Sequence, residues 1–460
     1  MKRREFLLGG GAAAGALGLG GIGLAAGAQE LVIQPASFTL RDQVTTGMVS
    51  LSPDAPPPVL HGKQGEVMRL PVRNTLPDYT AMHWHGLRIP NGMDGVPYLT
   101  QMPIGTDEVY SYEFTPPDAG TYWYHPHNRT WEQMARGLYG ALIVEEDAPP
   151  DVDRDLLLIA DDWRLDAAGK IDEASLGSLF ERAHAGRLGN ELTLNGVSLA
   201  ELAVRSGERV RLRLFNCCNA RVLQLRFEDL VPQVIAYDGQ PTAPSPLPDG
   251  KIEIAPAQRA DLLIDMTGAP GSKAAITEVS NERLVAGRFV YTAEPRLERD
   301  YGPLRLPANG LPKPNPANAK AVDLVMTGGA MGRLRHATYK GQEIGLRELA
   351  RQHGQVWAMN GVAGMPETPF FSAKRGQTVA IRMVNETRWP HAMHLHGHHF
   401  RETLTANASK RPPWRDTILL KANETRTVAF VADNPGKWML HCHMLEHQAG
   451  GMGTWFEVAA

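Results

Sequence analysis

The chain has 460 residues, of which 43% are hydrophobic and 21% charged, a composition that is ordinary for a folded soluble protein. Its net charge of −3 gives no basic excess for nucleic acid, and its 3 cysteines exclude a disulfide framework or a cysteine-rich zinc module. At roughly 100–200 residues per domain, the length predicts about three domains. The count that calls for an explanation is the 16 histidines.

Residues 1–28 have the pattern of an export signal. Arg3 and Arg4 precede an uncharged stretch that is rich in Gly and Ala and ends in Ala26-Gly27-Ala28. The paired arginines resemble a twin-arginine signal, which predicts passage through that export machinery to the periplasm or outside the cell. The alternative is a membrane anchor, although the Gly and Ala content makes the stretch weakly apolar. We expect no stable membrane insertion after cleavage.

One strand pattern occurs three times. Residues Gly65–Asn74, Gly207–Asn216 and Gly376–Asn385 each begin with a turn glycine, alternate apolar and polar side chains, and end in Asn. Frequent Pro, Gly and Asp turns separate other short β-rich runs, and the one short helix expected is residues 346–353. The pattern predicts an all-β protein of three β-sandwich domains. The expected parts are a signal (1–28), three domains (29–148, 149–300, 320–460) and a Pro-rich linker (301–319).

Histidine pairs follow the repeat in the first domain. His83 and His85 stand nine and eleven residues after Asn74, and His125 and His127 form a second His-x-His pair. Residues i and i+2 of a strand point to the same face, so each pair directs two imidazoles at one site.

The middle domain breaks this pattern. At the same offsets after Asn216 it has Leu225 and Phe227, which predicts a domain without metal ligands that separates or shapes the other two. Its adjacent Cys217 and Cys218 have Cα atoms about 3.8 Å apart, shorter than ordinary disulfides allow. That spacing favours two buried thiols on a strand over a strained vicinal disulfide.

The third domain restores the histidines. His394 and His396 stand nine and eleven residues after Asn385, and His441 and His443 form the fourth pair. Imidazole is a good ligand for zinc, copper, iron and nickel. The eight imidazoles of the four pairs suffice for a cluster of about three metal ions at two or three ligands each.

Cys442 indicates which metal is bound. It lies between two of these histidines, so strand alternation sends its thiol to the opposite face, toward a different ion. His391, His447 and Met452 are close to it in sequence or in the repeat. Two His, one Cys and a weak axial Met describe a blue-copper electron-transfer site, whereas zinc sites do not favour a thioether. The chain through Cys442 and its neighbours would carry electrons from this copper to the cluster.

Together these motifs resemble those of bacterial multicopper oxidases of the laccase-like, three-cupredoxin-domain kind. The matching motifs are His83-Trp-His85-Gly86, Tyr124-His125-Pro-His127, His391-Ala-Met-His394-Leu-His396-Gly397 and His441-Cys442-His443-Met-Leu-Glu-His447 through Met452. The resemblance covers nearly all of the chain after the signal. It implies Greek-key cupredoxin-like sandwiches, about four copper ions and O₂ as electron acceptor. One departure is Ala392, where the family usually has Pro.

The resemblance also implies a role for individual residues. It implies type 1 copper at His391, Cys442, His447 and Met452, type 2 copper at His83 and His394, and the type 3 pair at His85, His125, His127, His396, His441 and His443. Asp94 and Glu446 resemble the family's proton-relay acids, and O₂ reduction in a closed site needs such groups; the alternative for Asp94 is a turn residue. The histidines that fit no ligand position, expected as surface or packing residues, are His61, His184, His336, His353, His398 and His399. For His398 and His399, which closely follow a cluster motif, the alternative is a role in supporting the ligands.

Three functions remain open. The first is a laccase-like oxidase of phenols and aromatic amines, and the second is an oxidase of Cu(I), Fe(II) or Mn(II) in metal homeostasis. The methionines are scattered, which weakens the Cu(I) interpretation, because thioethers gather where Cu(I) is handled. The third is a copper-free relative with a cell-division or scaffold role, which should lack the ligands retained here. We expect a monomer that uses O₂ and a small reducing substrate.

Overall fold

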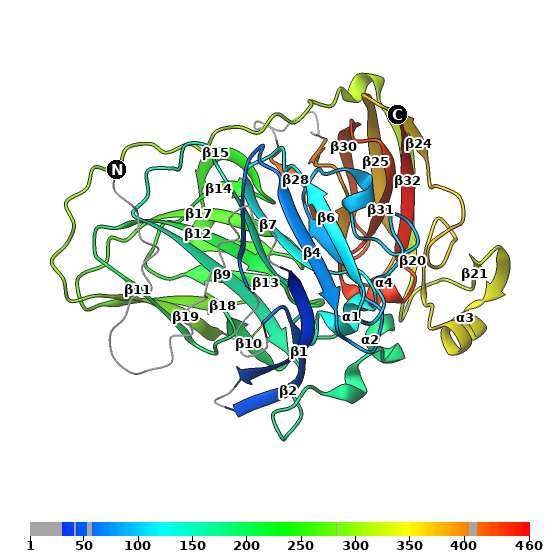
Figure 1. The fold of residues 1–460 in the computed structure, drawn as a ribbon, viewed down its shortest axis with the longest axis horizontal. Helices are drawn as coiled ribbons and strands as arrows, with labels where there is room; N and C mark the ends of the chain where they lie inside the picture. Colours follow the sequence, from blue (N-terminus) through cyan, green and yellow to red (C-terminus); the bar gives the residue numbers. More distant parts are fainter. Residues whose placement is uncertain (1–29, 41–42, 53–57, 282, 404–411) are drawn as a thin grey trace.

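The computed structural model of the chain describes residues 30–40, 43–52, 58–281, 283–403 and 412–460. The expected export signal lies outside these residues. Strands dominate the described chain and form three successive pairs of sheets, so the predicted all-β class is confirmed (Figure 1). No helix in the described part is long and apolar enough to cross a membrane.

The first sandwich lies in the centre of Figure 1, in blue and cyan. One sheet has the order β2 (Gln43–Ser50), β1 (Leu31–Leu40), β4 (Met68–Asn74), β6 (Val109–Phe114). The other has the order β3 (Leu60–Lys63), β8 (Gly140–Glu145), β7 (Gly120–Pro126), β5 (Met82–His85). A short helix, α1 (Thr130–Gln133), follows β7.

The middle sandwich is the green part of Figure 1. Its first sheet has the order β10 (Glu191–Leu194), β9 (Arg154–Trp163), β12 (Arg209–Asn216), β17 (Arg259–Asp265), β14 (Gln233–Tyr237), β15 (Gln240–Pro246). Its second has the order β11 (Ala200–Val204), β19 (Leu284–Tyr291), β18 (Lys273–Glu278), β13 (Leu223–Phe227), β16 (Lys251–Ile254). The helix α2 (Leu179–Ala183) lies between β9 and β10.

The third sandwich is yellow to red in Figure 1. One sheet has the order β23 (Trp357–Met359), β20 (Lys320–Gly328), β25 (Gln377–Asn385), β30 (Thr425–Ala432), β27 (Phe400–Glu402), β28 (Trp414–Arg415). The other has the order β24 (Ser372–Lys374), β32 (Gly453–Ala459), β31 (Gly436–Cys442), β26 (His391–Leu395), β29 (Thr417–Leu420). A hairpin of β21 (His336–Tyr339) and β22 (Gln342–Gly345) leads into α3 (Leu346–His353), the predicted helix, and α4 (Leu445–Ala449) follows β31.

The asparagine that ends each sequence repeat makes the same set of hydrogen bonds in all three sandwiches. Asn74, Asn216 and Asn385 are the last residues of β4, β12 and β25, and all three are buried. In each, the side-chain Nδ2 donates to the main-chain carbonyl four or five residues later and to a second carbonyl of the same sandwich. The Oδ1 accepts from the N–H two residues on. The asparagine therefore fixes the turn that leads to the next strand, β5, β13 or β26, in each sandwich.

The histidine strands pair in an equivalent register in the first and third sandwiches. In β5 and β7, His83 lies opposite His125, and in β26 and β31, His394 lies opposite His441. On β13 of the middle sandwich the equivalent Leu225 is buried in the apolar core, as is Phe227. The same backbone position thus presents a polar cluster in two sandwiches and a hydrocarbon core in one.

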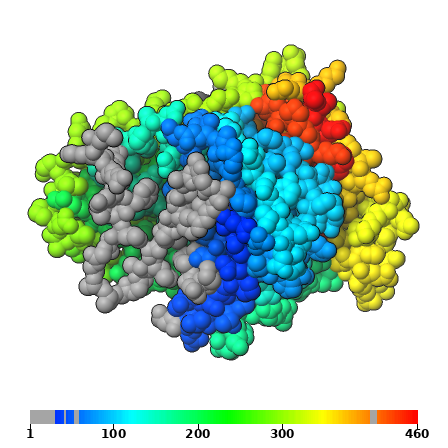
Figure 2. Space-filling view, viewed as in Figure 1, coloured from blue at the N-terminus to red at the C-terminus, as the bar shows by residue number. Residues whose placement is uncertain are grey.

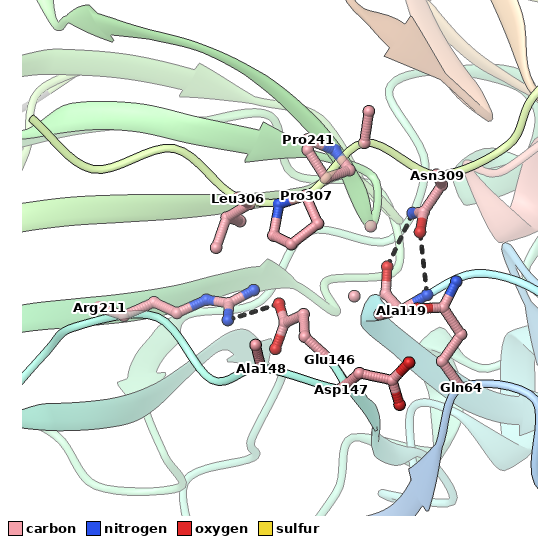
Figure 3. A pocket seen from close by; sticks show the side chains of 13 residues that line it. Gln64, Ala119, Glu146, Asp147, Ala148, Arg211, Pro241, Leu306, Pro307 and Asn309 are labelled. Atoms are coloured by element: carbon pink, nitrogen blue, oxygen red, sulfur yellow. Dashed lines mark hydrogen bonds and ion pairs between the residues drawn. The ribbon is translucent and has the colours of Figure 1, made fainter.

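Residues 301–319 contain no strand, as expected of a linker, and one short 3₁₀ turn, Pro316–Asn318. Leu304 and Leu306 pack on the middle sandwich, and Asn309 bonds to the main chain of Ala119. Figure 3 shows a cavity of about 150 Å³ between this segment and the first two sandwiches. None of the predicted metal ligands lines it.

The first and third sandwiches are also joined directly. Figure 2 shows the blue and cyan surface of the first meeting the orange and red surface of the third. Arg88 donates to Asp118 of its own sandwich and, at 2.9 Å, to Asp433 of the third. Asn91 Nδ2 donates to the carbonyl of Lys437 at 2.6 Å. This contact brings β5 and β7 close to β26 and β31.

Candidate metal centre

The four histidine pairs form one buried group between the first and third sandwiches, which we call the histidine cluster. Its members are His83, His85, His125, His127, His394, His396, His441 and His443. All are at most 7% exposed. The ring of His83 lies 4.0 Å from that of His396, and the ring of His85 lies 3.7 Å from that of His394, measured between centroids. The predicted convergence of the four pairs is confirmed as geometry.

Six of these imidazoles have one ring nitrogen bonded to a main-chain carbonyl or to a carboxylate, which accepts when ionised. In His125, His394 and His441 the Nδ1 atom donates to a main-chain carbonyl at 2.9 to 3.0 Å. Two contacts involve the segment around Asp94: His83 Nδ1 donates to its carbonyl at 2.6 Å, and His396 Nδ1 to its carboxylate at 3.0 Å. The sixth is His85 Nε2, which lies 3.3 Å from a carboxylate oxygen of Asp416. Each bond places the ring proton on the outer nitrogen and leaves a lone pair on the inner one.

Several inner nitrogens have no donor to accept from among the described residues. The Nε2 atoms of His83, His127 and His394 have no hydrogen-bond partner. The Nε2 atoms of His396 and His441 face each other at 3.1 Å. Because the outer nitrogens of this facing pair carry the protons, two lone pairs point at one another, and only a cation between them relieves the repulsion. The donor set therefore fits metal ions bound by imidazole.

Burial keeps these rings neutral. It lowers the pKa of His441 to about 4, and it lowers the pKa values of His85, His125 and His396 well below the ordinary value, with the neighbouring imidazoles adding to the shift. A protonated ring cannot bind a metal, so the low pKa values keep the lone pairs available at neutral pH.

A second group lies on the other face of β31. Cys442 Sγ is 3.7 Å from His391 Nδ1 and 3.8 Å from His447 Nδ1, and the two Nδ1 atoms are 3.0 Å apart. Thr387 accepts from His391 Nε2 at 2.8 Å, which again leaves the inner nitrogen with a lone pair. Strand alternation thus separates the thiol from the flanking cluster histidines, as predicted. We call His391, Cys442 and His447 the mononuclear group.

The thiol of this group is shielded from solvent. Burial raises the pKa of Cys442 to about 12, and the N–H of Met444 donates to its sulfur at 3.4 Å. A metal ion is needed to hold such a thiol as thiolate at neutral pH. Met452 is buried in the same core, its N–H donates to the carbonyl of His447, and its carbonyl accepts from the N–H of Cys442. The predicted fourth residue is therefore tied to Cys442 and His447 through the main chain.

The two predicted proton-relay acids have different surroundings. Asp94 contacts the cluster itself, through His396 and the main-chain bond to His83. Glu446 faces the middle sandwich, where its carboxylate accepts from Asn219 Nδ2 at 2.9 Å and from the N–H of Arg187 at 3.1 Å. Burial raises the pKa of Glu446. The structure therefore brings Asp94 to the cluster, and the contacts of Glu446 lie outside it.

Several residues that contact the proposed ligands could not be recognised from sequence. The carbonyl of His184, a histidine predicted to be an ordinary packing residue, accepts from His447 Nε2 at 2.8 Å. His399 is buried with Nε2 3.1 Å from the carbonyl of Asp238, which agrees with the predicted packing role. Asp416 bonds to cluster histidines of both sandwiches. No motif marks these residues, because they come from loops of different domains.

Comparison with known proteins agrees with this geometry. Family models described as multicopper oxidase match residues 32–149, 154–285 and 342–460. This chain belongs to the multicopper oxidase family. The crystal structure of Lac15 from a marine microbial metagenome is 38% identical, with a TM-score of 0.73 over 93% of this chain and 99% of that one.

Two further relatives extend the comparison. The crystal structure of a multi-copper oxidase from Pseudomonas thermotolerans is 30% identical, with a TM-score of 0.81 over 94% of this chain and 99% of that one. Laccase-1 of Fomitopsis schrenkii is 29% identical over 87% of this chain and 80% of its own length. This multicopper oxidase is thus a laccase-like, copper-dependent oxidoreductase that uses O₂, built from three cupredoxin-like domains as predicted.

Proposed function

We propose that the protein is an exported oxidase that transfers electrons from aromatic substrates through the mononuclear group to O₂ at the histidine cluster. The observation that carries this proposal is the convergence of inner ring nitrogens in two groups on opposite faces of one strand, β31. When bound, copper supplies one-electron oxidation at the first group and four-electron reduction of O₂ to water at the second.

The contacts support a division of the cluster ligands into three sets. One trio, His127, His396 and His441, has its nitrogens within 4.8 Å of one another. In a second trio, His125 Nε2 lies 3.3 Å from both His85 Nδ1 and His443 Nε2. We assign one type 3 copper to each trio and type 2 copper to the remaining pair, His83 and His394. His391, Cys442, His447 and Met452 are the proposed type 1 ligands, which makes four coppers per chain.

The cover of the mononuclear group favours an aromatic substrate. The Nε2 atom of His447, which would otherwise face an entering substrate, is bonded to the carbonyl of His184. The ring of His184 stacks on Phe180 at 4.1 Å and meets Trp389 edge-on at 5.5 Å. Phe180 is 63% exposed. A planar phenol or aromatic amine would stack on this surface, one hydrogen bond from a copper ligand.

A metal-ion substrate is the second candidate, and one observation favours it. Met331 is 73% exposed, and its neighbour Ala330 bonds to the carbonyl of Ala183, beside His184. A thioether next to the entry surface is suited to Cu(I). It is a single thioether, whereas the aromatic surface is continuous over three rings, so we rank Cu(I) second.

The two candidates are separated by a matched pair of variants. Copper-loaded protein is assayed by O₂ uptake with a phenol, Cu(I), Fe(II) and Mn(II) in parallel. We expect uptake with the phenol, and Phe180→Ala to raise its KM with little change in kcat, while Met331→Leu leaves phenol oxidation unchanged. Faster uptake with Cu(I) that falls in Met331→Leu would establish the metal oxidase instead. Protein that binds fewer than about three coppers and takes up no O₂ would refute both.

The proposed location follows from the first residues of the chain. The twin-arginine-like start and the Ala26-Gly27-Ala28 site support export to the periplasm, with cleavage after Ala28. Fusion of residues 1–28 to a reporter tests this: the reporter should reach the periplasm, and Arg3→Lys with Arg4→Lys should retain it in the cytoplasm.

A further inference from the structure

Asp416 contacts two of the proposed copper ligands, and they come from different sandwiches. Its carboxylate oxygen lies 3.3 Å from His85 Nε2, and its main-chain carbonyl accepts from His394 Nδ1 at 3.0 Å. His85 belongs to the first sandwich and to a proposed type 3 trio, whereas His394 belongs to the third sandwich and the proposed type 2 pair. Asp416 has no exposed surface. A single buried residue therefore orients ligands of two different coppers.

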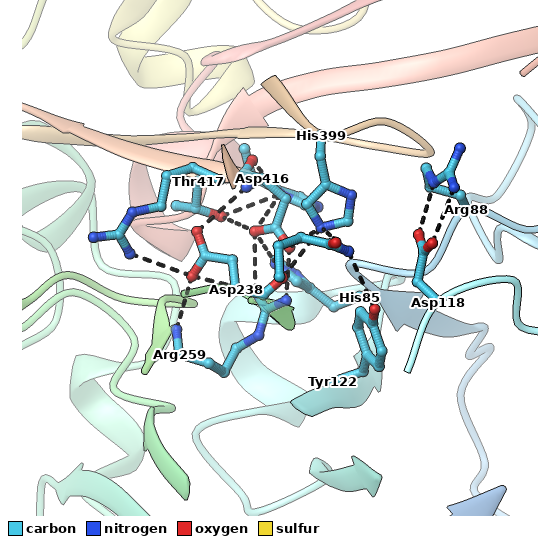
Figure 4. A network of polar contacts seen from close by, with 12 residues as sticks. His85, Arg88, Asp118, Tyr122, Asp238, Arg259, His399, Asp416 and Thr417 are labelled. Atoms are coloured by element: carbon cyan, nitrogen blue, oxygen red, sulfur yellow. Dashed lines mark hydrogen bonds and ion pairs between the residues drawn. The ribbon is translucent and has the colours of Figure 1, made fainter. Parts of the chain in front are cut away.

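The charge of Asp416 is balanced from the middle sandwich. Arg259, the first residue of β17, donates from Nη1 to Asp416 Oδ1 at 3.0 Å and from Nη2 to Oδ2 at 2.7 Å (Figure 4). Arg259, like Asp416, is fully buried. Without this arginine, the buried carboxylate of Asp416 would carry a large desolvation penalty. The planar guanidinium also fixes the plane of the carboxylate, because both of its oxygens are engaged at once.

A second carboxylate of the middle sandwich completes the arrangement. Asp238, directly after β14, accepts from the main-chain N–H of Arg259 at 2.9 Å and from that of Asp416 at 3.3 Å. Gly86, the residue after His85, leaves room for the pair: a Cβ there would lie 2.4 Å from Arg259 Nη2 and 2.6 Å from Asp416 Oδ2. Its φ of +87° is also one that side chains rarely adopt. Residues of all three sandwiches thus meet at one buried carboxylate.

We propose that Arg259 and Asp238 are positioning residues of the copper cluster. Although it supplies no ligand, the middle sandwich holds Asp416 in place and through it sets the ring orientations of His85 and His394. The inference rests on the proposed function, since it concerns the same cluster. The ligand-free domain thereby acquires a chemical role, because it fixes from outside the group that aligns ligands from both of its neighbours.

The test compares two buried arginines of the same sheet. Arg259→Met removes the fork to Asp416, and Arg211→Met is the control. Arg211 is likewise buried and donates to a carboxylate, Asp261, at 2.6 to 3.0 Å, away from the cluster residues. Copper-loaded variants are studied for copper content under a chelator, for the type 2 EPR signal, for the near-ultraviolet absorption of the type 3 pair and for the blue absorption of Cys442-bound copper.

We expect Arg259→Met to keep the blue absorption, to change the type 2 and type 3 signals, and to lose cluster copper at about ten-fold lower chelator concentration. Arg259→Lys should fall between, because it keeps the charge without the fork. Arg211→Met should give wild-type spectra even if it lowers thermal stability. Wild-type spectra in Arg259→Met, or equal changes in both Met variants, would overturn the inference. Wild-type protein without cluster signals would refute the proposed function itself.

Thr417→Val tests the same arrangement if Arg259→Met does not fold. Thr417 Oγ1 donates to Asp416 Oδ1 at 2.8 Å and lies 3.2 Å from His394 Nδ1. Valine has nearly the same shape and removes only these bonds. We expect an altered type 2 EPR signal with unchanged type 3 absorption, because Arg259 still holds the carboxylate that contacts His85. An unaltered type 2 signal would contradict the premise that bonds around Asp416 orient His394, and the proposal for Arg259 and Asp238 would fall with it.

Discussion

The middle sandwich and its two neighbours share one strand repeat, but the side chains that follow the repeat differ in chemistry. Nine residues after the repeat asparagine, the first and third sandwiches carry His83 and His394, whereas the middle one carries Leu225. The histidines face each other across a domain boundary, and the leucine faces the core of its own sandwich. The shared backbone thus sets where a side chain points, and the side chain decides whether the position serves a metal centre or a core.

This difference has an energetic side. Inner lone pairs that face each other are unfavourable until a cation joins them, so the cluster gains stability from copper. The middle sandwich does not depend on a metal ion for stability at this position, because Leu225 and Phe227 pack in an apolar core. Its contribution to the metal centre, Arg259, comes from a different strand, where charge is buried together with its partner. Breaking each of these elements separately sharpens the comparison.

The largest effect is expected at the carboxylate that touches the cluster. Asp94→Asn keeps a side-chain oxygen that accepts from His396 Nδ1 but removes the group that can carry a proton. O₂ reduction should slow by about 100-fold, the range of a lost general acid. Copper content should stay normal, as measured by metal analysis beside O₂ uptake. Copper loss that accompanies the slowdown would mean a structural role.

Two further variants are compared with Asp94→Asn. Asp118→Asn is the control, because Asp118 is equally buried and its carboxylate accepts from Arg88, outside the cluster. It should leave O₂ reduction unchanged. Glu446→Gln, the second predicted relay acid, should slow O₂ reduction less than Asp94→Asn, since the carboxylate of Glu446 is held by Asn219 and Arg187. An equal loss of O₂ reduction in Glu446→Gln and Asp94→Asn would place the two acids on one proton path.

Much of the fold and most of the candidate site could be predicted from the sequence, because both depend on local periodicity. The alternation of β4, β12 and β25 and the His-x-His spacing are properties of single strands. The helix at Leu346–His353 also has a local signal. Cys217 and Cys218 are buried free thiols, in agreement with the favoured interpretation, but they follow β12 directly and are not part of it.

The remaining features depend on contacts between distant segments, which no local pattern records. His184 shields the mononuclear group through its carbonyl, and a carbonyl leaves no trace in residue identity. Asp416 and Arg259 are 157 residues apart in the chain and meet only because three sandwiches pack together. The predicted surface or packing role of His184 therefore missed the bond from its carbonyl to His447.

A smaller effect is expected at the asparagines that end the repeat. Asn385→Ala and Asn216→Ala each remove hydrogen bonds from a buried amide to two main-chain carbonyls, so each should lower the free energy of unfolding by about 2 kcal/mol. Asn385 Oδ1 also accepts from the hydroxyl of Thr387, which in turn accepts from His391 Nε2. Asn385→Ala should therefore change the blue absorption as well, whereas Asn216→Ala should not. An equal change in blue absorption in Asn385→Ala and Asn216→Ala would show that the copper site responds only to the loss of stability.

The last effect leaves the copper sites aside and concerns the pH dependence of stability. Burial, together with neighbouring Asp162, raises the pKa of Asp161 on β9 to about 8. The unfolded carboxyl ionises near 3.9, so at about pH 5 to 7 the folded chain holds a proton that the unfolded chain has released. The contribution of Asp161 to the free energy of unfolding is fully present below its pKa in the unfolded chain. It is lost as the pH rises to and through its pKa in the folded chain, by up to about 1.4 kcal/mol per pH unit. Asp161→Asn removes this dependence, so its thermal midpoint relative to wild type should increase with pH.

Asp155, on the same strand, provides the opposite case. Burial by itself would raise its pKa, but the charge and hydrogen bonds of Arg213 prevail and lower it below the ordinary value. The carboxylate of Asp155 stabilises the folded chain at pH values above its pKa in the unfolded chain. This stabilisation is lost as the pH falls through its lower pKa in the folded chain. Asp155→Asn should therefore lower the midpoint by the same amount across about pH 5 to 7. Parallel pH profiles for the two variants would show that Asp161 is ionised in the folded middle sandwich, because only a proton held by the folded state makes the profiles diverge.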